Sequence, residues 1–109
     1  MATTYKVLGQ SNPSATTATT LYTTPAATQT IVSTITVCNQ AATAATYRIA
    51  VRVAGAALAA NQYVAYDVSL PGNASDTLTL GITLGAADVI TVYASTATMS
   101  FSAFGSELS

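Results

Sequence analysis

Few residues of this chain could carry chemistry. Histidine and tryptophan are absent, the one cysteine is Cys38, and the acidic residues are Asp67, Asp76, Asp88 and Glu107. Without histidine, a Ser-His-Asp or Cys-His nucleophile and a histidine-ligated metal site are excluded. Asp76 and Asp88 fall in or beside predicted turns, where they could meet as a glycosidase pair or share a calcium ion. Turn formation through bonds to local backbone amides is the simpler interpretation, so we predict no enzyme and no cofactor.

The remaining candidates are interface residues. Arg48 and Arg52 lie four apart in a predicted strand, so they project from one face about 13 Å apart and cannot clamp one ligand group. Either could pair with Asp67, bond Glu107 across a subunit boundary, or remain a lone surface arginine. We predict an interface that uses Arg48, Arg52, Tyr63 and Glu107, since Arg and Tyr are enriched at interfaces. Among the six tyrosines, some belong in the core and others could form an aromatic platform for a sugar.

The elements that position these residues are short strands. Residues 28–53 contain two alternating runs around a polar break at 39–43. The apolar face of the first run is expected to hold Ile31, Ile35 and Val37. The apolar face of the second run is expected to hold Tyr47, Ile49, Val51 and Val53. Two such runs around a short break predict a β-hairpin in the middle of an antiparallel sheet.

Further strands are predicted at 3–8, 21–24, 62–70, 77–84, 89–94 and 98–104. Strand 62–70 should place Val64, Tyr66, Val68 and Leu70 on one face, and strand 77–84 should do so with Leu78, Leu80, Ile82 and Leu84. Gly81 suggests a bulge or a close backbone approach. Residues 9–20 are expected to form a surface loop or an extended arm, 54–61 a connection that could contain one helical turn, and 105–109 a tail. About eight strands at regular spacing predict an all-β, single-domain antiparallel β-sandwich over residues 1–109, jelly-roll-like in character.

The composition favours assembly with other protein. Charged residues make up 6% of the chain and the net charge is −1, whereas a typical soluble domain has about 25% charged residues. So little charge does not keep copies apart in solution, although a neutral Thr/Ser-rich monomer is the alternative. Three scattered cations disfavour nucleic-acid binding. No apolar run is long enough to insert into a membrane, and no signal peptide is visible.

Several sequence blocks resemble a family of small virion proteins of tailed bacteriophages, particularly those that infect cyanobacteria. The blocks are YKVLGQ (5–10), LYTTPA (21–26), VSTITVCNQ (32–40), YRIAVR (47–52), YVAYDV (63–68), LTLGITL (78–84), VITVYAST (89–96) and FSAFGSE (101–107). The similarity covers nearly the whole chain but includes no active-site motif. It implies a structural protein of the virion, assembled in the host cytoplasm, and identifies no functional residues.

Three functions follow as hypotheses. The first is a capsid decoration (cement) protein, a homotrimer that binds the major capsid protein and stabilises the head lattice. The second is a neck or tail component, a fibre or collar subunit that contacts host-surface glycans. The third is a non-viral adhesin or carbohydrate module, which the missing signal peptide and the absence of tryptophan disfavour.

Overall fold

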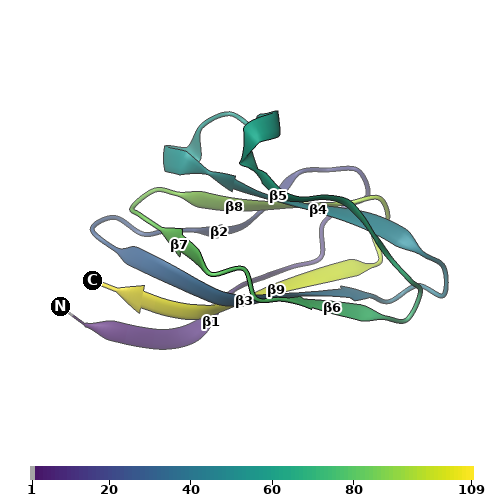
Figure 1. The fold of residues 1–109 in the computed structure, drawn as a ribbon, viewed down its shortest axis with the longest axis horizontal. Helices are drawn as coiled ribbons and strands as arrows, with labels where there is room; N and C mark the ends of the chain where they lie inside the picture. Colours follow the sequence, from purple (N-terminus) through teal and green to yellow (C-terminus); the bar gives the residue numbers. More distant parts are fainter. Residues whose placement is uncertain (1) are drawn as a thin grey trace.

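Residues 2–109, which a computed structural model describes, form two antiparallel sheets packed face to face (Figure 1). The strands, with two short 3₁₀ turns labelled η, are β1 (Thr3–Ser11), β2 (Thr19–Thr23), β3 (Gln29–Asn39), β4 (Ala45–Arg52), η1 (Val53–Gly55), η2 (Ala60–Gln62), β5 (Tyr63–Leu70), β6 (Ser75–Leu78), β7 (Ile82–Leu84), β8 (Val89–Ala94) and β9 (Met99–Leu108). Within these residues, no helix has the length and apolar character that crossing a membrane requires.

The strand order is that of a jelly roll. Sheet A has the order β1-β9-β3, with β6 and β7 both on the far edge of β3; sheet B has the order β2-β8-β4-β5. The first half of the chain pairs with the second half in reverse order, like one long hairpin rolled up. The resulting pairs are β1/β9, β2/β8, β3 with β6 and β7, and β4/β5. Since β6 and β7 share one position, the sandwich has eight strand positions over residues 2–109. The predicted all-β sandwich is confirmed.

The core lies between the two sheets. Its largest side chains include Tyr47 and Phe101, whose rings meet edge to face at 6.1 Å. Around this pair lie aliphatic side chains from both sheets: Val32, Ile35, Val37, Ile49, Leu70, Ile90, Val92 and Met99. The apolar residues that face inward along the strands of both sheets are therefore buried together, and this burial holds the sandwich together.

The predicted hairpin over residues 28–53 is wrong. β3 lies in sheet A and β4 in sheet B, so the two runs face each other across the core and do not pair. The break between them is fixed by Asn39, whose side chain is fully buried. Its Nδ2 donates to the Thr43 carbonyl oxygen at 2.9 Å and to that of Leu70 at 3.2 Å. These bonds tie the connection to the end of β5 and replace the ladder that a hairpin would have formed.

A bulge explains why Ile31 does not share a face with Ile35 and Val37. Opposite β9, Val32 pairs with Gly105 and Thr34 with Phe104, which leaves Ser33 as an extra residue in β3. An extra residue reverses the alternation of faces. Val32 is consequently buried, and Ile31 is 54% exposed on the outer face of sheet A.

The predicted strand 77–84 is divided into β6 and β7. Gly81 has φ of +65° between them, and a Cβ built there would meet no atom within 4 Å. Gly81 therefore permits a left-handed turn of the backbone rather than a close approach. Leu84 is buried, but Leu80 lies in the break and is 44% exposed, so the prediction that Leu80 faces the core is wrong.

The chain ends lie side by side on sheet A. The predicted tail 105–109 is wrong, because β9 continues to Leu108 with β1 and β3 as partners on both sides. The amide of Ala2 donates to Ser109 O at 2.6 Å. Residues 9–20 contribute to β1 and β2, and the loop between them is held to the body by a bond from Thr16 N to Ala94 O at 2.8 Å.

We predict that Ile49→Ala lowers the free energy of unfolding by about 2–5 kcal/mol, because the Ile49 side chain is fully buried and its truncation leaves a cavity. Leu80→Ala is the matched control and should change it by no more than about 0.5 kcal/mol. Urea denaturation measures both. Equal losses in the two variants would contradict the strand register described above.

Candidate binding surfaces

Arg48 lies on the outer face of sheet B against two tyrosine rings. Its guanidinium carbon is 4.2 Å from the centroid of Tyr66 and 4.4 Å from that of Tyr93. Its Nε donates to Asp67 Oδ1 at 2.6 Å and its Nη2 to Asp67 Oδ2 at 3.3 Å. This hydrogen-bonded pairing holds the pKa of Asp67 below its usual range. A planar guanidinium suits both the bidentate pairing and the stacking, which a lysine could not reproduce.

Two bulges in β5 assemble this cluster. Opposite β4, Tyr47 pairs with Val68 and Ile49 with Ala65, so both Tyr66 and Asp67 lie opposite Arg48 alone. Asp67 adopts φ of +49°, a left-handed conformation that Asp tolerates better than most residues. A second shift makes Tyr63 pair with Ala50. The predicted alternation of 62–70 is therefore wrong: Val68 and Leu70 point inward, whereas Tyr66 is 56% exposed.

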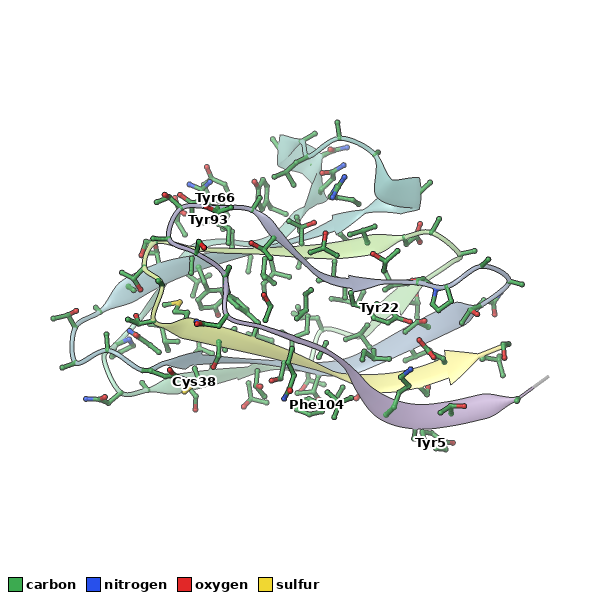
Figure 2. All side chains as sticks on the ribbon, turned by 180° about the vertical axis from the view of Figure 1, so that it is seen from behind. Tyr5, Tyr22, Cys38, Tyr66, Tyr93 and Phe104 are labelled. Atoms are coloured by element: carbon green, nitrogen blue, oxygen red, sulfur yellow. The ribbon has the colours of Figure 1, made fainter. Side chains whose placement is uncertain are left out.

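A groove borders the cluster. Its lining residues are Leu58, Ala59, Ala60, Tyr63 and Tyr66, and its volume is about 550 Å³. The rings of Tyr63 and Tyr66 meet edge to face with centroids 4.9 Å apart. Figure 2 shows Tyr66 and Tyr93 together on this outer face of the sandwich. One wall of the groove is thus aromatic, and the other is the connection between η1 and η2.

Arg52 anchors that connection. Its Nε donates to the Ala56 carbonyl oxygen at 2.7 Å and its Nη2 to that of Gly55 at 3.0 Å. Asp88 accepts the Ala54 amide at 2.8 Å, and Gln62 Nε2 donates to the Ala57 carbonyl oxygen at 2.9 Å. The wall of the groove is therefore fixed by side chains before any ligand arrives.

The outer face of sheet A carries no charged side chain in residues 2–109. The strands of sheet A contain three residues that are charged at neutral pH, and all three are on the inward side. In register, Lys6 pairs with Gly105, Asp76 with Val37, and Glu107 with Thr30. Outward lie Tyr5, which is 84% exposed, Val7, Ile31 and Phe104, among serines and threonines. Figure 2 shows Tyr5 and Phe104 on the side opposite Tyr66. An exposed apolar patch without charge is typical of a surface that binds protein.

Two tyrosines of sheet B reach across the sandwich and donate hydrogen bonds to the inward carboxylates of sheet A. Tyr47 donates its hydroxyl to Asp76 Oδ2 at 2.8 Å. Tyr22 donates to Glu107 Oε2 at 2.5 Å and shares a 2.8 Å bond with Thr30. Burial, and then the bond to Glu107, raises the pKa of Tyr22 to about 12, while that same bond lowers the pKa of Glu107. Lys6 Nζ lies 3.2 Å from Glu107 Oε1.

The hypothesis that Asp76 and Asp88 meet as an acid pair is wrong. Asp76 lies opposite Val37, near the end of β3, whereas Asp88 precedes β8 beside the end of β4, at the other end of the sandwich. Asp88 accepts backbone amides, including that of Gly85 at 2.8 Å, as expected of a turn residue. In residues 2–109, no three His, Cys, Asp or Glu side chains come together as metal ligands.

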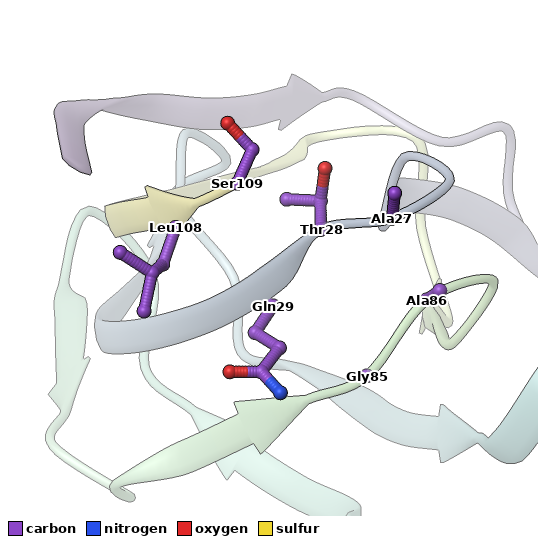
Figure 3. Close-up of a pocket in the computed structure, with 7 residues that line it drawn as sticks. All are labelled: Ala27, Thr28, Gln29, Gly85, Ala86, Leu108 and Ser109. Carbon is purple, nitrogen blue, oxygen red and sulfur yellow. The ribbon is translucent and has the colours of Figure 1, made fainter. Parts of the chain in front are cut away.

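A second cavity of about 380 Å³ opens at the end of the sandwich where β9 finishes (Figure 3). It is lined by Ala27, Thr28, Gln29, Gly85, Ala86, Leu108 and Ser109. The hydroxyls of Thr28 and Ser109 are the nucleophilic side chains of this lining, and it contains no ionisable side chain that could act as their base. It is accordingly a weaker candidate than the groove on sheet B.

The predicted site residues lie in three places. Arg48 and Tyr63 belong to the cluster and groove on sheet B, Arg52 holds the groove wall, and Glu107 lies between the sheets, bonded to Tyr22. The pairing of Arg48 with Asp67 was one of the alternatives that the sequence left open. Sequence reasoning misses the contribution of Tyr66, because the bulges of β5 carry no distinctive sequence signal. It misses that of Tyr93 because Tyr93 lies opposite Arg48 only through the pairing of β4 with β8, strands that are distant in sequence.

No protein-family model, curated protein or solved structure matches this chain. Its resemblance to phage virion proteins therefore stays a prediction, and the interface roles of Arg48, Arg52, Tyr63 and Glu107 do so as well.

We predict that Tyr22→Phe lowers the free energy of unfolding by about 1.5–3 kcal/mol at neutral pH, since it removes a hydrogen bond to a carboxylate. The lowered pKa of Glu107 stabilises the fold above the ordinary carboxyl value, and this contribution is lost as the pH falls through the folded pKa. The raised pKa of Tyr22 stabilises below the ordinary phenol value and is lost as the pH rises toward about 12.

The difference in free energy of unfolding between wild type and Tyr22→Phe should thus be largest from about pH 5 to 9 and smaller below and above this range. Urea denaturation from about pH 3 to 11 measures it, because the range must extend beyond both sides of this plateau. Tyr5→Phe, at an exposed tyrosine, is the control and should be neutral. A difference that does not change with pH would show that the Tyr22–Glu107 bond is not responsible.

Proposed function

We propose that this protein is a structural component of a tailed-phage virion: a capsid decoration protein that binds the major capsid protein as a trimer. The observation that carries the proposal is the uncharged outer face of sheet A, with Tyr5, Val7 and Ile31 exposed and Phe104 partly exposed on it. The predicted resemblance of its sequence blocks to small virion proteins supports the same setting. Jelly rolls are also frequent in viral capsid proteins, an analogy of fold alone.

The uncharged face suits attachment to a repeating protein lattice. The centre of a protein interface is depleted of charged residues and enriched in aromatic ones. On sheet A, the charges that would have to be desolvated on docking already point into the sandwich, where Tyr22 and Tyr47 satisfy the carboxylates. A decoration protein that binds only assembled shells stabilises them by mass action, because binding shifts the equilibrium toward the assembled state.

A second candidate is a neck or tail component, a fibre or collar subunit that contacts host-surface glycans. The observation that favours it is the groove with Tyr63 and Tyr66 on the outer face of sheet B. A tyrosine presents an apolar ring and a polar hydroxyl, which suits contact with sugars. The docking face is the same in both candidates, but the partner protein differs.

We predict that Ile31→Lys weakens binding to capsids that lack the protein by at least about tenfold, because an ammonium buried without a partner is strongly unfavourable. Val53→Lys is the matched control: Val53 is also β-branched and is 68% exposed, but lies on the side of sheet B. Co-sedimentation of each purified variant with the capsids measures binding.

Circular dichroism and the urea midpoint establish that both variants fold. If Ile31→Lys binds as wild type does, sheet A is not the docking face. If wild type itself does not bind the capsids, the decoration role is lost.

A further inference from the structure

The groove on the outer face of sheet B has features that docking through sheet A does not explain. It combines exposed apolar surface from Leu58 and Tyr66 with the ion pair of Arg48 and Asp67, which lies beside Tyr66 and outside the lining of the groove. Its wall is held by Arg52 and Gln62. A pre-formed concave site with a few polar groups beside aromatic rings is typical of a small-ligand site.

We propose that this groove binds a neutral saccharide, with the apolar C–H face of a pyranose against Tyr63 and Tyr66 and its hydroxyls toward Arg48 and Asp67. The proposal rests on the second candidate function and deepens it, since it specifies a neutral glycan and the side chains that would contact it. It does not depend on capsid attachment.

The donors and acceptors at the border of the groove suit adjacent hydroxyls. Asp67 uses two of the N–H donors of Arg48, and a guanidinium has further donors. Each carboxylate oxygen of Asp67 also has a second lone pair available. A hydroxyl both donates and accepts, so two neighbouring hydroxyls of one sugar would satisfy both partners. Both groups are solvent-accessible, with Asp67 the more exposed of the two.

The same groups disfavour other ligand classes. An anionic ligand would compete with Asp67 for Arg48, whose charge is already balanced by a bidentate partner. A proline-rich peptide also binds aromatic grooves, but proline has no N–H and cannot use the lone pairs of Asp67 that Arg48 leaves free. A neutral polyol is the class that uses the rings, the donors and the acceptors together.

The site is rigid before binding, which reduces the entropy lost on association. Tyr66 is held from one side by Arg48 and contacts Tyr63, so the ring that would stack on the sugar has defined neighbours. Arg48 in turn is held by Asp67 and Tyr93. Single-site affinity for a saccharide would be weak, and many copies on one particle would raise it through multivalency.

The test is a titration of the ¹⁵N-labelled protein, followed by NMR, with a panel of neutral oligosaccharides of glucose, mannose and galactose. We expect saturable shifts of amide signals from residues 58–60 and 63–67, and none from β1. An oligogalacturonate and an oligoproline peptide are titrated in parallel. Shifts at these residues with either of these two but with no neutral sugar would overturn the proposal, as would no shift with any sugar.

Three variants distinguish the loss of aromatic stacking on the sugar from a loss of folding. Tyr66→Ala should weaken saccharide binding at least about tenfold, the usual scale of losing one aromatic anchor. Tyr66→Phe keeps the ring and should stay within about threefold of wild type. Tyr5→Ala, on the opposite sheet, should bind normally, and the amide spectrum of each variant shows whether it folds.

Equal binding by Tyr66→Ala and wild type would overturn the proposal. The outcome is independent of the capsid experiment, because it uses the isolated protein. Capsid binding without sugar binding rejects only the saccharide site, and sugar binding without capsid binding rejects only the decoration role.

Discussion

Two hydrogen bonds that cross the sandwich determine much of its surface. Tyr47 and Tyr22 reach from sheet B to Asp76 and Glu107 on the inward side of sheet A. A carboxylate placed between two sheets is costly unless it is hydrogen-bonded, so the tyrosine hydroxyls make its position possible. Lys6 approaches Glu107 from the edge strand β1. With the charges of sheet A turned inward, its outer face is left with hydroxyls, amides and exposed apolar side chains.

The two outer faces of the jelly roll consequently differ in chemistry. Sheet A presents an uncharged face suited to burial against protein, whereas sheet B carries both ion-paired charges and a groove. The groove depends on irregularity: two bulges in β5 place Tyr63, Tyr66 and Asp67 on one side, and the connection fixed by Arg52 builds the other wall. Bulges often re-aim side chains at functional positions. A protein that attaches by one face and presents the other to its surroundings could use both surfaces at once.

The sequence predicted the architecture better than the local registers. Alternating Thr and β-branched residues with turn clusters were enough to predict a sandwich of about eight strands, because period-two burial follows directly from strand geometry. The extra residue at Ser33 and the left-handed Asp67 reversed faces that simple alternation had assigned, as for Ile31 and Tyr66. The β3–β4 connection resembles a hairpin in the sequence because its length suits a hairpin as well as a connection between sheets. The bond that decides between them, from Asn39 to the Leu70 carbonyl oxygen, joins residues distant in sequence. For the site, Arg48 and Tyr63 were found from residue type, but their neighbours depend on cross-strand register.

We propose that the uncharged face of sheet A covers a repeating protein lattice. Counting the copies of this chain in purified virions of a phage that encodes it, by quantitative mass spectrometry against the major capsid protein, tests this role. For a protein that covers the lattice, we expect a copy number comparable with that of the capsid protein. A copy number of only a small fraction of it would place the chain at the neck or tail. Absence from the virion would contradict the structural role altogether.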